Sequence, residues 1–489
     1  MQGKKLYTEQ LFKSFQLSQR VPEDNFYRRL KDLFNLQWLY KETKKYYGTE
    51  GQQSIDPVVF FKLMLIGYLE NLGSDRRIIS TVSMRLDMLF FIGYDIDEPL
   101  PWHSTLSRTR QLYGEDVFKE LFRKVLSLCI DKGMVAGKRQ AMDSVYVQAN
   151  ASMESLQRKE VLKDADDYTD ELNTDEEEIF PAQKNTDLQN NEATKQDLLS
   201  VASLGKEPVC NNNEWSKSLS NHTLQSTTDK DARVSVKPGK TRRLNYLAQV
   251  SVDTANHVIT QIQSDFADKK DSQCLPSLLH NTIDNLRETG LQIEEVLADG
   301  NYSSSEALHT LEEENIIGYI PNFGQYKSLR KGFSYDKGND CYVCSQGKIL
   351  EYKSIKKSHG NVEMKQYRSS SKDCAVCPLR SQCIGKSAFK TIAVTVDKEL
   401  FEKMHNRLQT PMARRMKKLR SSTVEPVLGT LVNFLGMRRV YTKGVSLAGK
   451  CMTMAAIAYN LKKLMKWQSQ KVHTDIKELR YSLQPLFLS

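Results

Sequence analysis

The sequence predicts an α/β protein: a mixed sheet with an antiparallel edge, preceded by an all-helical region and interrupted by insertions. Apolar residues recur at helical spacing through residues 1–115. Strand-like and helical segments then alternate between residues 139 and 320, and two of the strands read as a hairpin. Strands that alternate with helices are typical of α/β sheets, and the hairpin supplies the antiparallel edge.

The chain has 489 residues, enough for roughly two to four domains. Its most apolar stretch, residues 58–69, is interrupted by Lys62 and is shorter than the roughly 20 residues that span a bilayer. The first residues lack the apolar core of a signal peptide. We therefore expect a cytoplasmic protein, associated with the nucleoid if it binds DNA, and without a membrane partner.

Charge is distributed unevenly around a net value of +10. Residues 164–180 contain nine acidic side chains and no basic one, whereas residues 403–466 contain fourteen Lys or Arg and one acid, Glu425. A charge run usually marks a solvated surface. Because this basic run overlaps apolar helical patterning, a face that meets nucleic-acid phosphates is the better interpretation.

Helix signals are clearest in the N-terminal 115 residues. Asp56-Pro57 has the pattern of an N-cap followed by proline in the first turn, and predicts a helix to about Leu72. Residues 76–91 form a second amphipathic segment, and His103 is expected to cap a third helix. This arrangement suits a helix-turn-helix DNA reader, although a helical dimerisation bundle fits equally well. The arginines expected to contact DNA here are Arg108 and Arg110.

The remaining boundaries follow shifts in composition. Residues 116–153 contain a helix and a strand, residues 154–240 are polar and predict a largely flexible insertion, and residues 241–321 resume the sheet. Residues 322–395 form a second, cysteine-rich insertion. Residues 396–470 are basic and helical, and residues 471–489 are expected to be a peripheral tail.

Three carboxylates, far apart in the sequence, are candidates for one site. Asp143 lies in the middle of the strand-like segment 139–149, and Asp299 follows an apolar strand at an Asp-Gly-Asn turn. Glu425 is expected near the start of a helix. Asp and Glu oxygens suit two Mg²⁺ or Mn²⁺ ions, which activate the attacking oxygen and neutralise the leaving one in phosphodiester chemistry. The alternatives are a turn residue for Asp299 and a capping box, Ser422 with Glu425, at a helix start.

These motifs resemble those of a known family. Residues 141–152, Ala-Met-Asp-Ser-Val-Tyr-Val-Gln-Ala-Asn-Ala-Ser, are similar to the first-Asp motif of bacterial insertion-sequence transposases of the DDE class. Residues 298–303, Ala-Asp-Gly-Asn-Tyr-Ser, resemble their second-Asp motif, and residues 422–429, Ser-Thr-Val-Glu-Pro-Val-Leu-Gly, resemble their Glu motif. The resemblance covers most of the chain except residues 154–225.

The resemblance implies an RNase H-like catalytic core and a DNA transposase. Such an enzyme hydrolyses phosphodiester bonds at the inverted-repeat ends of an insertion sequence and transfers the freed strand to target DNA. The catalytic, metal-binding residues would be Asp143, Asp299 and Glu425. Double-stranded DNA would be the partner, and a homodimer is expected because two ends are cut together. A catalytically inactive DNA-binding relative and a nuclease without strand transfer are the alternatives.

The chain departs from the family pattern after the Glu motif. Many relatives carry a Lys about two turns after the Glu, where this chain has Val432, and the spacing from Arg420 to Glu425 is one residue longer than is common. The basic residues expected to bind phosphate in place of that Lys are Lys418, Arg438, Arg439 and Lys443, and Arg420 is also expected to contact DNA.

The cysteines of the second insertion form a further candidate site. Cys341-x2-Cys344 and Cys374-x2-Cys377 have the spacing of a zinc ribbon, with Cys383 as a fifth thiol. We expect these four cysteines to hold a structural zinc ion. The alternative is a metal-free insertion with reduced thiols.

Overall fold

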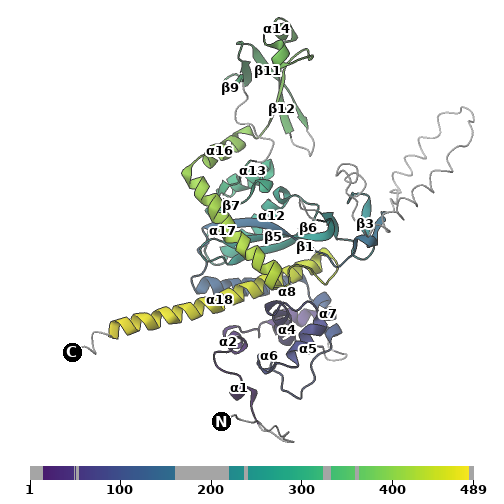
Figure 1. The fold of residues 1–489 in the computed structure, drawn as a ribbon, viewed down its shortest axis with the longest axis vertical. Coiled ribbons are helices and arrows are strands. Elements are labelled where there is room, and N and C mark those ends of the chain that lie inside the picture. Colours follow the sequence, from purple (N-terminus) through teal and green to yellow (C-terminus); the bar gives the residue numbers. More distant parts are fainter. Residues whose placement is uncertain are drawn as a thin grey trace, which may run out of the picture.

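The computed structural model describes residues 15–48, 50, 54–159, 220–235, 241–322, 332–357 and 363–483, of which the last fifteen are described by their backbone alone. Figure 1 shows a helical domain at the N-terminal end, a sheet with covering helices in the middle, and a small antiparallel sheet at the far end. Most of the predicted polar insertion, residues 160–219, lies outside the described residues, as do the first fourteen residues and the last six.

The N-terminal domain is helical, as predicted. Helix α4 is buried on almost every side, which explains its lack of a polar face. The predicted cap is confirmed, since the Asp56 carboxylate accepts from the backbone N–H groups of Val58 and Val59. The single helix expected over residues 76–91 was wrong, because residues 83–85 break it into α5 and α6. The helices are α1 (Leu17–Arg20), α2 (Phe26–Leu33), α3 (Leu39–Thr43), α4 (Pro57–Leu69), α5 (Asp75–Val82), α6 (Leu86–Ile92), α7 (His103–Leu112) and α8 (Glu115–Asp131).

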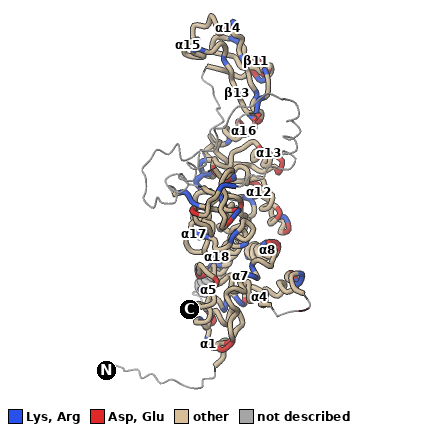
Figure 2. Tube along the Cα trace, turned by 90° about the vertical axis from the view of Figure 1, so that its right-hand side faces the viewer, with Lys and Arg blue, Asp and Glu red and all other residues tan. Residues whose placement is uncertain are grey.

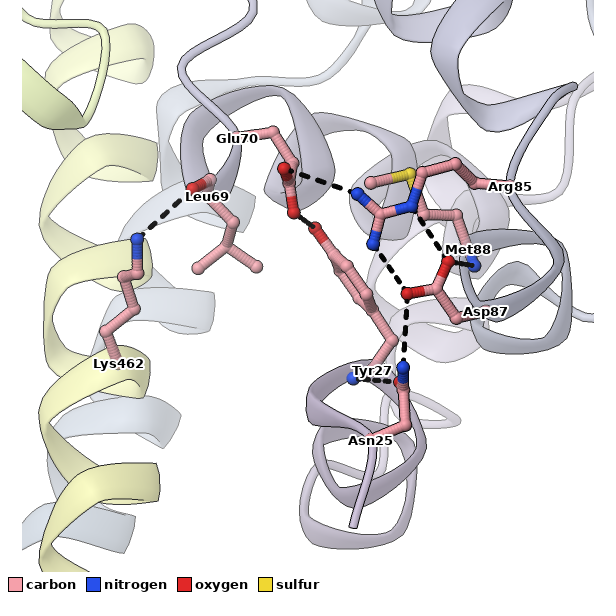
Figure 3. A network of polar contacts seen from close by, with 8 residues as sticks. All are labelled: Asn25, Tyr27, Leu69, Glu70, Arg85, Asp87, Met88 and Lys462. Atoms are coloured by element: carbon pink, nitrogen blue, oxygen red, sulfur yellow. Dashed lines mark hydrogen bonds and ion pairs between the residues drawn. The ribbon is translucent and has the colours of Figure 1, made fainter. Parts of the chain in front are cut away.

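A polar network ties three helices of this domain together (Figure 3). Arg85 lies 2.6 Å from Asp87 and 3.5 Å from Glu70, and Glu70 accepts a hydrogen bond from the Tyr27 hydroxyl. The Asn25 side chain, which caps α2, also donates to Asp87. The buried Tyr27 hydroxyl and the partly buried Asp87 carboxylate therefore each have partners, which offset their loss of hydration.

The central sheet has the strand order β6-β5-β1-β7-β8, and the short strand β4 pairs with the start of β5 beyond the end of β6. Strand β5 is antiparallel to both β1 and β6, and β1 is parallel to β7, which is parallel to β8. This is the topology of an RNase H-like core, as expected. The strands are β1 (Arg139–Gln148), β4 (Arg233–Ser235), β5 (Arg243–Asp253), β6 (Ile259–Phe266), β7 (Glu295–Leu297) and β8 (Ile317–Tyr319).

Helices cover both faces of this sheet. Helices α12 (Asp271–Arg287) and α13 (Ser305–Glu313) pack on one face, where Met142 and Ala298 are buried. The other face carries Ala141 and Leu297 and packs against α17 and α18. Because side chains alternate along a strand, Asp143 shares the α17 face with Ala141.

The cysteine-rich insertion forms its own antiparallel sheet, ordered β13-β12-β11-β10-β9, with two short helices beside it. Its small core is built on Tyr342, Leu350, Tyr367 and Ile392. The bounds are β9 (Phe333–Asp336), β10 (Cys341–Cys344), β11 (Ile349–Lys357), β12 (Glu363–Ser369), α14 (Ser371–Ala375), α15 (Arg380–Cys383) and β13 (Thr391–Thr395).

Three helices close the chain: α16 (Lys398–Leu408), α17 (Pro411–Phe434) and α18 (Val445–Leu483). The expected helix start near Glu425 was wrong, because α17 begins at Pro411 with Thr410 as its cap. Ser422 donates to the Leu419 carbonyl and forms no capping box, and Pro426 lies inside the helix. Helix α18 continues to Leu483, so it runs through most of the segment expected to be a peripheral tail.

Helix α18 joins the helical domain to the core. The Lys450 ammonium is buried and donates to the carbonyls of Arg110 at 3.2 Å and Tyr113 at 2.6 Å. Further along the same helix, Lys462 donates to the Leu69 carbonyl (Figure 3). Within the described ranges, no helix combines the length and the hydropathy needed to cross a membrane.

Candidate active site

Asp143, on β1, and Asp299, just after the end of β7, are neighbours. Ala141 lies opposite Leu297 in the parallel pairing of β1 with β7, so the aspartates two residues further along each segment lie close together, on the side of the sheet that meets α17. Burial raises the pKa of Asp143, and the charge of Asp299 raises it further, against the hydrogen bond from the Ser144 N–H. The structure therefore brings together two of the three carboxylates that were predicted to share a site.

Asp299 also has a local structural role. Its carboxylate accepts from the Asn301 N–H at 2.9 Å, which closes the turn after β7. Burial raises its pKa, and the charge of Asp271 adds to the rise. The expected turn role and a place beside Asp143 therefore coexist in one residue.

Arg420 is the cation of this site. It extends from α17, and its Nη1 lies 2.9 Å from Oδ2 of Asp143. Both side chains are mostly buried, with exposed fractions of 16% and 19%. A guanidinium in this position compensates negative charge that would otherwise be destabilising next to Asp299. Arg420, predicted as a DNA-binding residue, is instead paired with a carboxylate in this structure.

Glu425 stands apart from the two aspartates. Successive residues of an α-helix are rotated by about 100° around its axis. Arg420, Val424 and Val427 therefore share the face of α17 that meets the core, and Glu425 lies on the opposite face. Val424 and Val427 are fully buried, whereas Glu425 is exposed. The prediction that all three carboxylates meet at one point is therefore not met in this structure. The sequence did not predict the orientation of Glu425, because its motif was interpreted as the first turn of a helix and not as the middle of one.

A buried polar layer lies behind the site, and the sequence reasoning missed it. The Tyr302 hydroxyl donates to the side-chain oxygen of Gln249, and the Gln249 amide nitrogen donates to Asp271 at 2.9 Å. Gln249 and Tyr302 are fully buried. The available signal was Gln249 itself, which with Ser251 interrupts the mostly apolar strand 246–252. Asp271, at the start of α12, is thus a further carboxylate near Asp299.

The chemistry of the donor set fits a hard divalent cation, but its geometry is incomplete. Asp143 and Asp299 offer carboxylate oxygens, the ligands that Mg²⁺ and Mn²⁺ prefer. Across the described parts of the chain, no three or more His, Cys, Asp or Glu side chains gather closely enough to hold a metal ion. Two carboxylates and one guanidinium are what the site brings together.

The other predicted DNA-binding residues divide into two groups. Arg110 was assigned wrongly to the surface: it is buried, and its guanidinium lies 2.6 Å from Asp75. It therefore joins α7 to α5 within the helical domain. The exposed residues are Arg108 on α7, Lys418 on α17, and Arg438, Arg439 and Lys443 in the segment between α17 and α18. Basic positions recur along α17 in Figure 2.

The predicted zinc ligands are not on one side of their sheet. Cys341 and Cys344 are three residues apart on β10, so strand alternation points them to opposite faces. Cys344 lies against the small core with Phe333, whereas Cys341 lies on the other face. One tetrahedral ion therefore cannot bind both, which contradicts the predicted set of Cys341, Cys344, Cys374 and Cys377.

The remaining thiols lie around one end of this sheet. Ser369 contacts the Cys374 thiol at 3.0 Å and accepts from the Lys390 N–H. The Lys390 ammonium donates to the Cys383 carbonyl and lies 5.6 Å from the centre of the Phe333 ring. Phe333 is the strand partner of Cys344. These contacts place Cys374 and Cys383 near Ser369 and Lys390, at the end of the sheet where Phe333 pairs with Cys344, but no three of the described thiols gather closely enough to hold a metal ion.

Two protein families match parts of the chain. The family described as Transposase domain (DUF772) matches residues 15–112, which contain α1 to α7. The family described as Transposase DDE domain matches residues 343–465, which contain α17, Arg420 and Glu425. No curated protein matches the sequence.

Solved structures of one transposase are similar over part of the chain. The Mos1 transposase paired-end complex with left transposon end aligns with 60% of this chain and 70% of its own, at 11% identity and a TM-score of 0.16. A pre-cleavage Mos1 transpososome aligns with 62% and 73%, at 10% identity and a TM-score of 0.15. Scores this low add nothing to the assignment. The two family matches show that residues 15–112 are similar to a transposase domain and that residues 343–465 are similar to a transposase DDE domain, in that order along the chain.

Proposed function

We propose that this transposase cuts and joins DNA at the inverted-repeat ends of an insertion sequence, with divalent metal ions held at Asp143 and Asp299. The observation that supports this most directly is that Asp143, on β1, lies beside Asp299, which comes just after the end of the parallel neighbour β7, and that both carboxylates are partly buried. When bound, Mg²⁺ or Mn²⁺ supplies activation of the attacking oxygen and charge neutralisation at the leaving oxygen.

The residues of this chain have distinct parts in that reaction. Asp143 and Asp299 would hold the cations where the end of β7 meets the middle of β1. Arg420 neutralises Asp143 in this structure and, once a cation compensated that carboxylate, would be free to contact a DNA phosphate. The buried Gln249 and Tyr302 fix the strands behind the site through their hydrogen bond.

We assign Glu425 as the third ligand, as the resemblance of its motif implies. In this structure the residue is exposed and directed away from the sheet, so the assignment requires α17 to turn, or the side chain to reach around it, when metal and DNA bind. Asp271 is the alternative third carboxylate, because its charge already acts on Asp299. One pair of variants decides between them.

The test is a cleavage assay with purified protein, Mn²⁺ or Mg²⁺, and duplex DNA carrying the element ends. D143N and D299N are expected to lower the cleavage rate by about 1,000-fold or more, since metal stabilisation supplies several kcal/mol and each 1.36 kcal/mol is tenfold. DNA binding by both variants should persist. The matched control is D284N, which removes an exposed carboxylate of α12.

The outcomes separate the alternatives. A loss in E425Q with activity in D271N supports Glu425, and the reverse result supports Asp271. Cleavage at the wild-type rate in D143N or D299N removes that residue from the metal site. Wild-type protein that binds the ends without any metal-dependent nicking is an inactive relative. Nicking without joined products identifies a nuclease that does not transfer strands.

Two further parts of the function are proposals as well. We propose that the enzyme assembles as a homodimer on DNA, because two element ends are cut together. We also propose that a structural zinc ion is held by Cys344, Cys374, Cys377 and Cys383, in place of the set that included Cys341; no three of these described thiols gather in the present structure, so zinc binding would have to draw them together. The support is the strand alternation of β10 and the contacts around Ser369 and Lys390. These thiols are the soft ligands that zinc prefers.

A further inference from the structure

A cleft lies between the helical domain and the segment that follows α17. Its volume is about 310 Å³. The helical domain supplies the end of α4 and the starts of α5 and α7, and the core supplies residues 436–442. We call it the interdomain cleft, and its lining includes Tyr68, Ser74, Arg76, His103, Arg439 and Tyr441.

The interdomain cleft is positively charged. Its one carboxylate, Asp75, is paired with the buried Arg110 at 2.6 Å, so these two charges cancel. Arg76 and Arg439 are exposed, and among the described residues neither forms an ion pair. Arg76 donates to the His103 ring at 3.3 Å, and Arg439 donates to the Asn150 side chain at 3.1 Å. Each guanidinium has five N–H donors and so keeps several for an anion.

Exposed aromatic rings stand beside these arginines. Tyr441 is 57% exposed, and the Arg439 guanidinium lies 5.9 Å from the centre of its ring. Trp102 does not itself line the cleft, but it is 70% exposed and its ring centre lies 5.0 Å from that of the lining residue His103. A Cβ on Gly73 would lie 2.8 Å from the Tyr441 hydroxyl, so the ring rests against a position without a side chain. Large rings exposed in this way usually mark a binding surface.

The interdomain cleft is also connected to the catalytic strand. Gln148, the last residue of β1, forms a bridge with Arg439, and its carbonyl accepts from the Val440 N–H. Asp143 lies five positions earlier on the same strand. At about 3.3 Å per residue, that is roughly 17 Å, or about five nucleotide steps at 3.4 Å each. DNA that leaves the aspartates along β1 therefore reaches the cleft within a few nucleotides.

We propose that the interdomain cleft binds unpaired nucleotides of the DNA strand next to the cleaved phosphate. Arg76 and Arg439 contact the phosphates, and Tyr441 and Trp102 stack on the bases. Aromatic rings beside a positive groove are how proteins bind single strands without reading their sequence. The volume of the cleft suits a nucleotide-sized group and is far too small for a duplex. The proposal rests on the proposed function for its DNA partner, and extends it to an unpaired segment.

The test uses the full chain and two fluorescent probes: a blunt duplex of about 20 base pairs, and the same duplex with a single-stranded extension of about five nucleotides. Binding is measured by anisotropy without divalent metal. Wild-type protein is expected to bind the extended probe more tightly. Y441A and W102A should each weaken that probe about 10-fold, as expected for loss of one base stack, and leave the blunt probe unchanged. Y441W should retain the preference.

The matched control is Y352A, which removes a 42% exposed tyrosine from the small sheet. R76A and R439A should lower the dependence of extended-probe binding on salt by about one counterion each. Thermal unfolding of each variant verifies that it is folded. Equal wild-type binding to both probes overturns the proposal, as does an equal loss in Y441A for both probes.

This binding assay needs no metal and no element sequence, so its result is independent of the cleavage assay. If the extension is preferred but no variant or wild-type protein cleaves DNA, the proposed function fails and the cleft assignment stands. If cleavage occurs and the extension gives no advantage, the cleft assignment fails alone.

Discussion

Nη1 of Arg420 lies 2.9 Å from Oδ2 of Asp143 and joins α17 to the central strand across 277 positions of sequence. The pair sits where two carboxylates of adjacent strands meet, and both of its members are mostly buried. In this structure, an arginine of the same chain therefore compensates part of the negative charge of the two carboxylates.

Replacement of Arg420 should make the fold depend on divalent metal. R420A leaves Asp143 and Asp299 uncompensated, and we expect a loss of about 1–3 kcal/mol in the free energy of unfolding, less than for a fully buried pair because both partners are partly exposed. Mg²⁺ or Mn²⁺ should raise the melting temperature of R420A more than that of the wild type. R438A, an exposed arginine, is the control. An R420A protein that metal does not stabilise would contradict the proposed cation site.

Lys450 should contribute more to the free energy of unfolding than Lys462, although both donate from α18 to carbonyls of the helical domain. Lys450 is 5% exposed and bonds two carbonyls, whereas Lys462 is exposed and bonds one. K450M leaves buried carbonyls without a donor, which is expected to cost about 1–3 kcal/mol. K462M should change stability by less than about 0.5 kcal/mol, as is usual at the surface. Chemical denaturation measures both, and equal effects would exclude burial as the cause.

Acid should weaken the network of Figure 3 through Asp87. Burial tends to raise the pKa of this carboxyl, but hydrogen bonds from Arg85 and Asn25 outweigh it, and the pKa lies below its usual value. Because the folded pKa is the lower one, the stabilisation is complete above the unfolded value, near 4, and is lost as the pH falls through the folded value.

D87N should therefore be less stable than the wild type at pH 7, and the difference should shrink as the pH falls below about 4. Unfolding monitored by circular dichroism across this pH range checks it. D284N, which removes an exposed carboxylate, should run parallel to the wild type. A difference between D87N and the wild type that is constant with pH would show that the ionised Asp87 contributes nothing.

Zinc content should distinguish the thiols of the small sheet. C344S and C383S are expected to lower bound zinc below about half an equivalent per chain, whereas C341S keeps one full equivalent, since structural sites bind tightly. Elemental analysis after metal-replete purification gives the stoichiometry. Loss of zinc in C341S would restore the originally predicted set, and less than half an equivalent in the wild type would mean that the thiols bind none.

The sequence predicted correctly those features that depend only on neighbouring residues. The alternation around Asp143, the turn at Asp299 and the cap at Asp56 all appear as expected, because strand period, turn and cap depend on a few neighbouring residues. The start of α17 was predicted wrongly because proline is usually found in the first turn of a helix. Pro426 lies instead inside a 24-residue helix, next to the buried Val424 and Val427.

The sequence alone determined the order of strands and helices, the motifs of the family and the basic character of the last helices, since each of these is a property of short segments. Only the tertiary structure decided which side chains meet. The parallel register of β1 and β7 brings Asp143 beside Asp299, and Arg420 forms an ion pair with Asp143. Glu425 is exposed, and Arg110 is buried. The physical reason is that each of these contacts joins segments remote in sequence, where packing and charge compensation in three dimensions override any local preference.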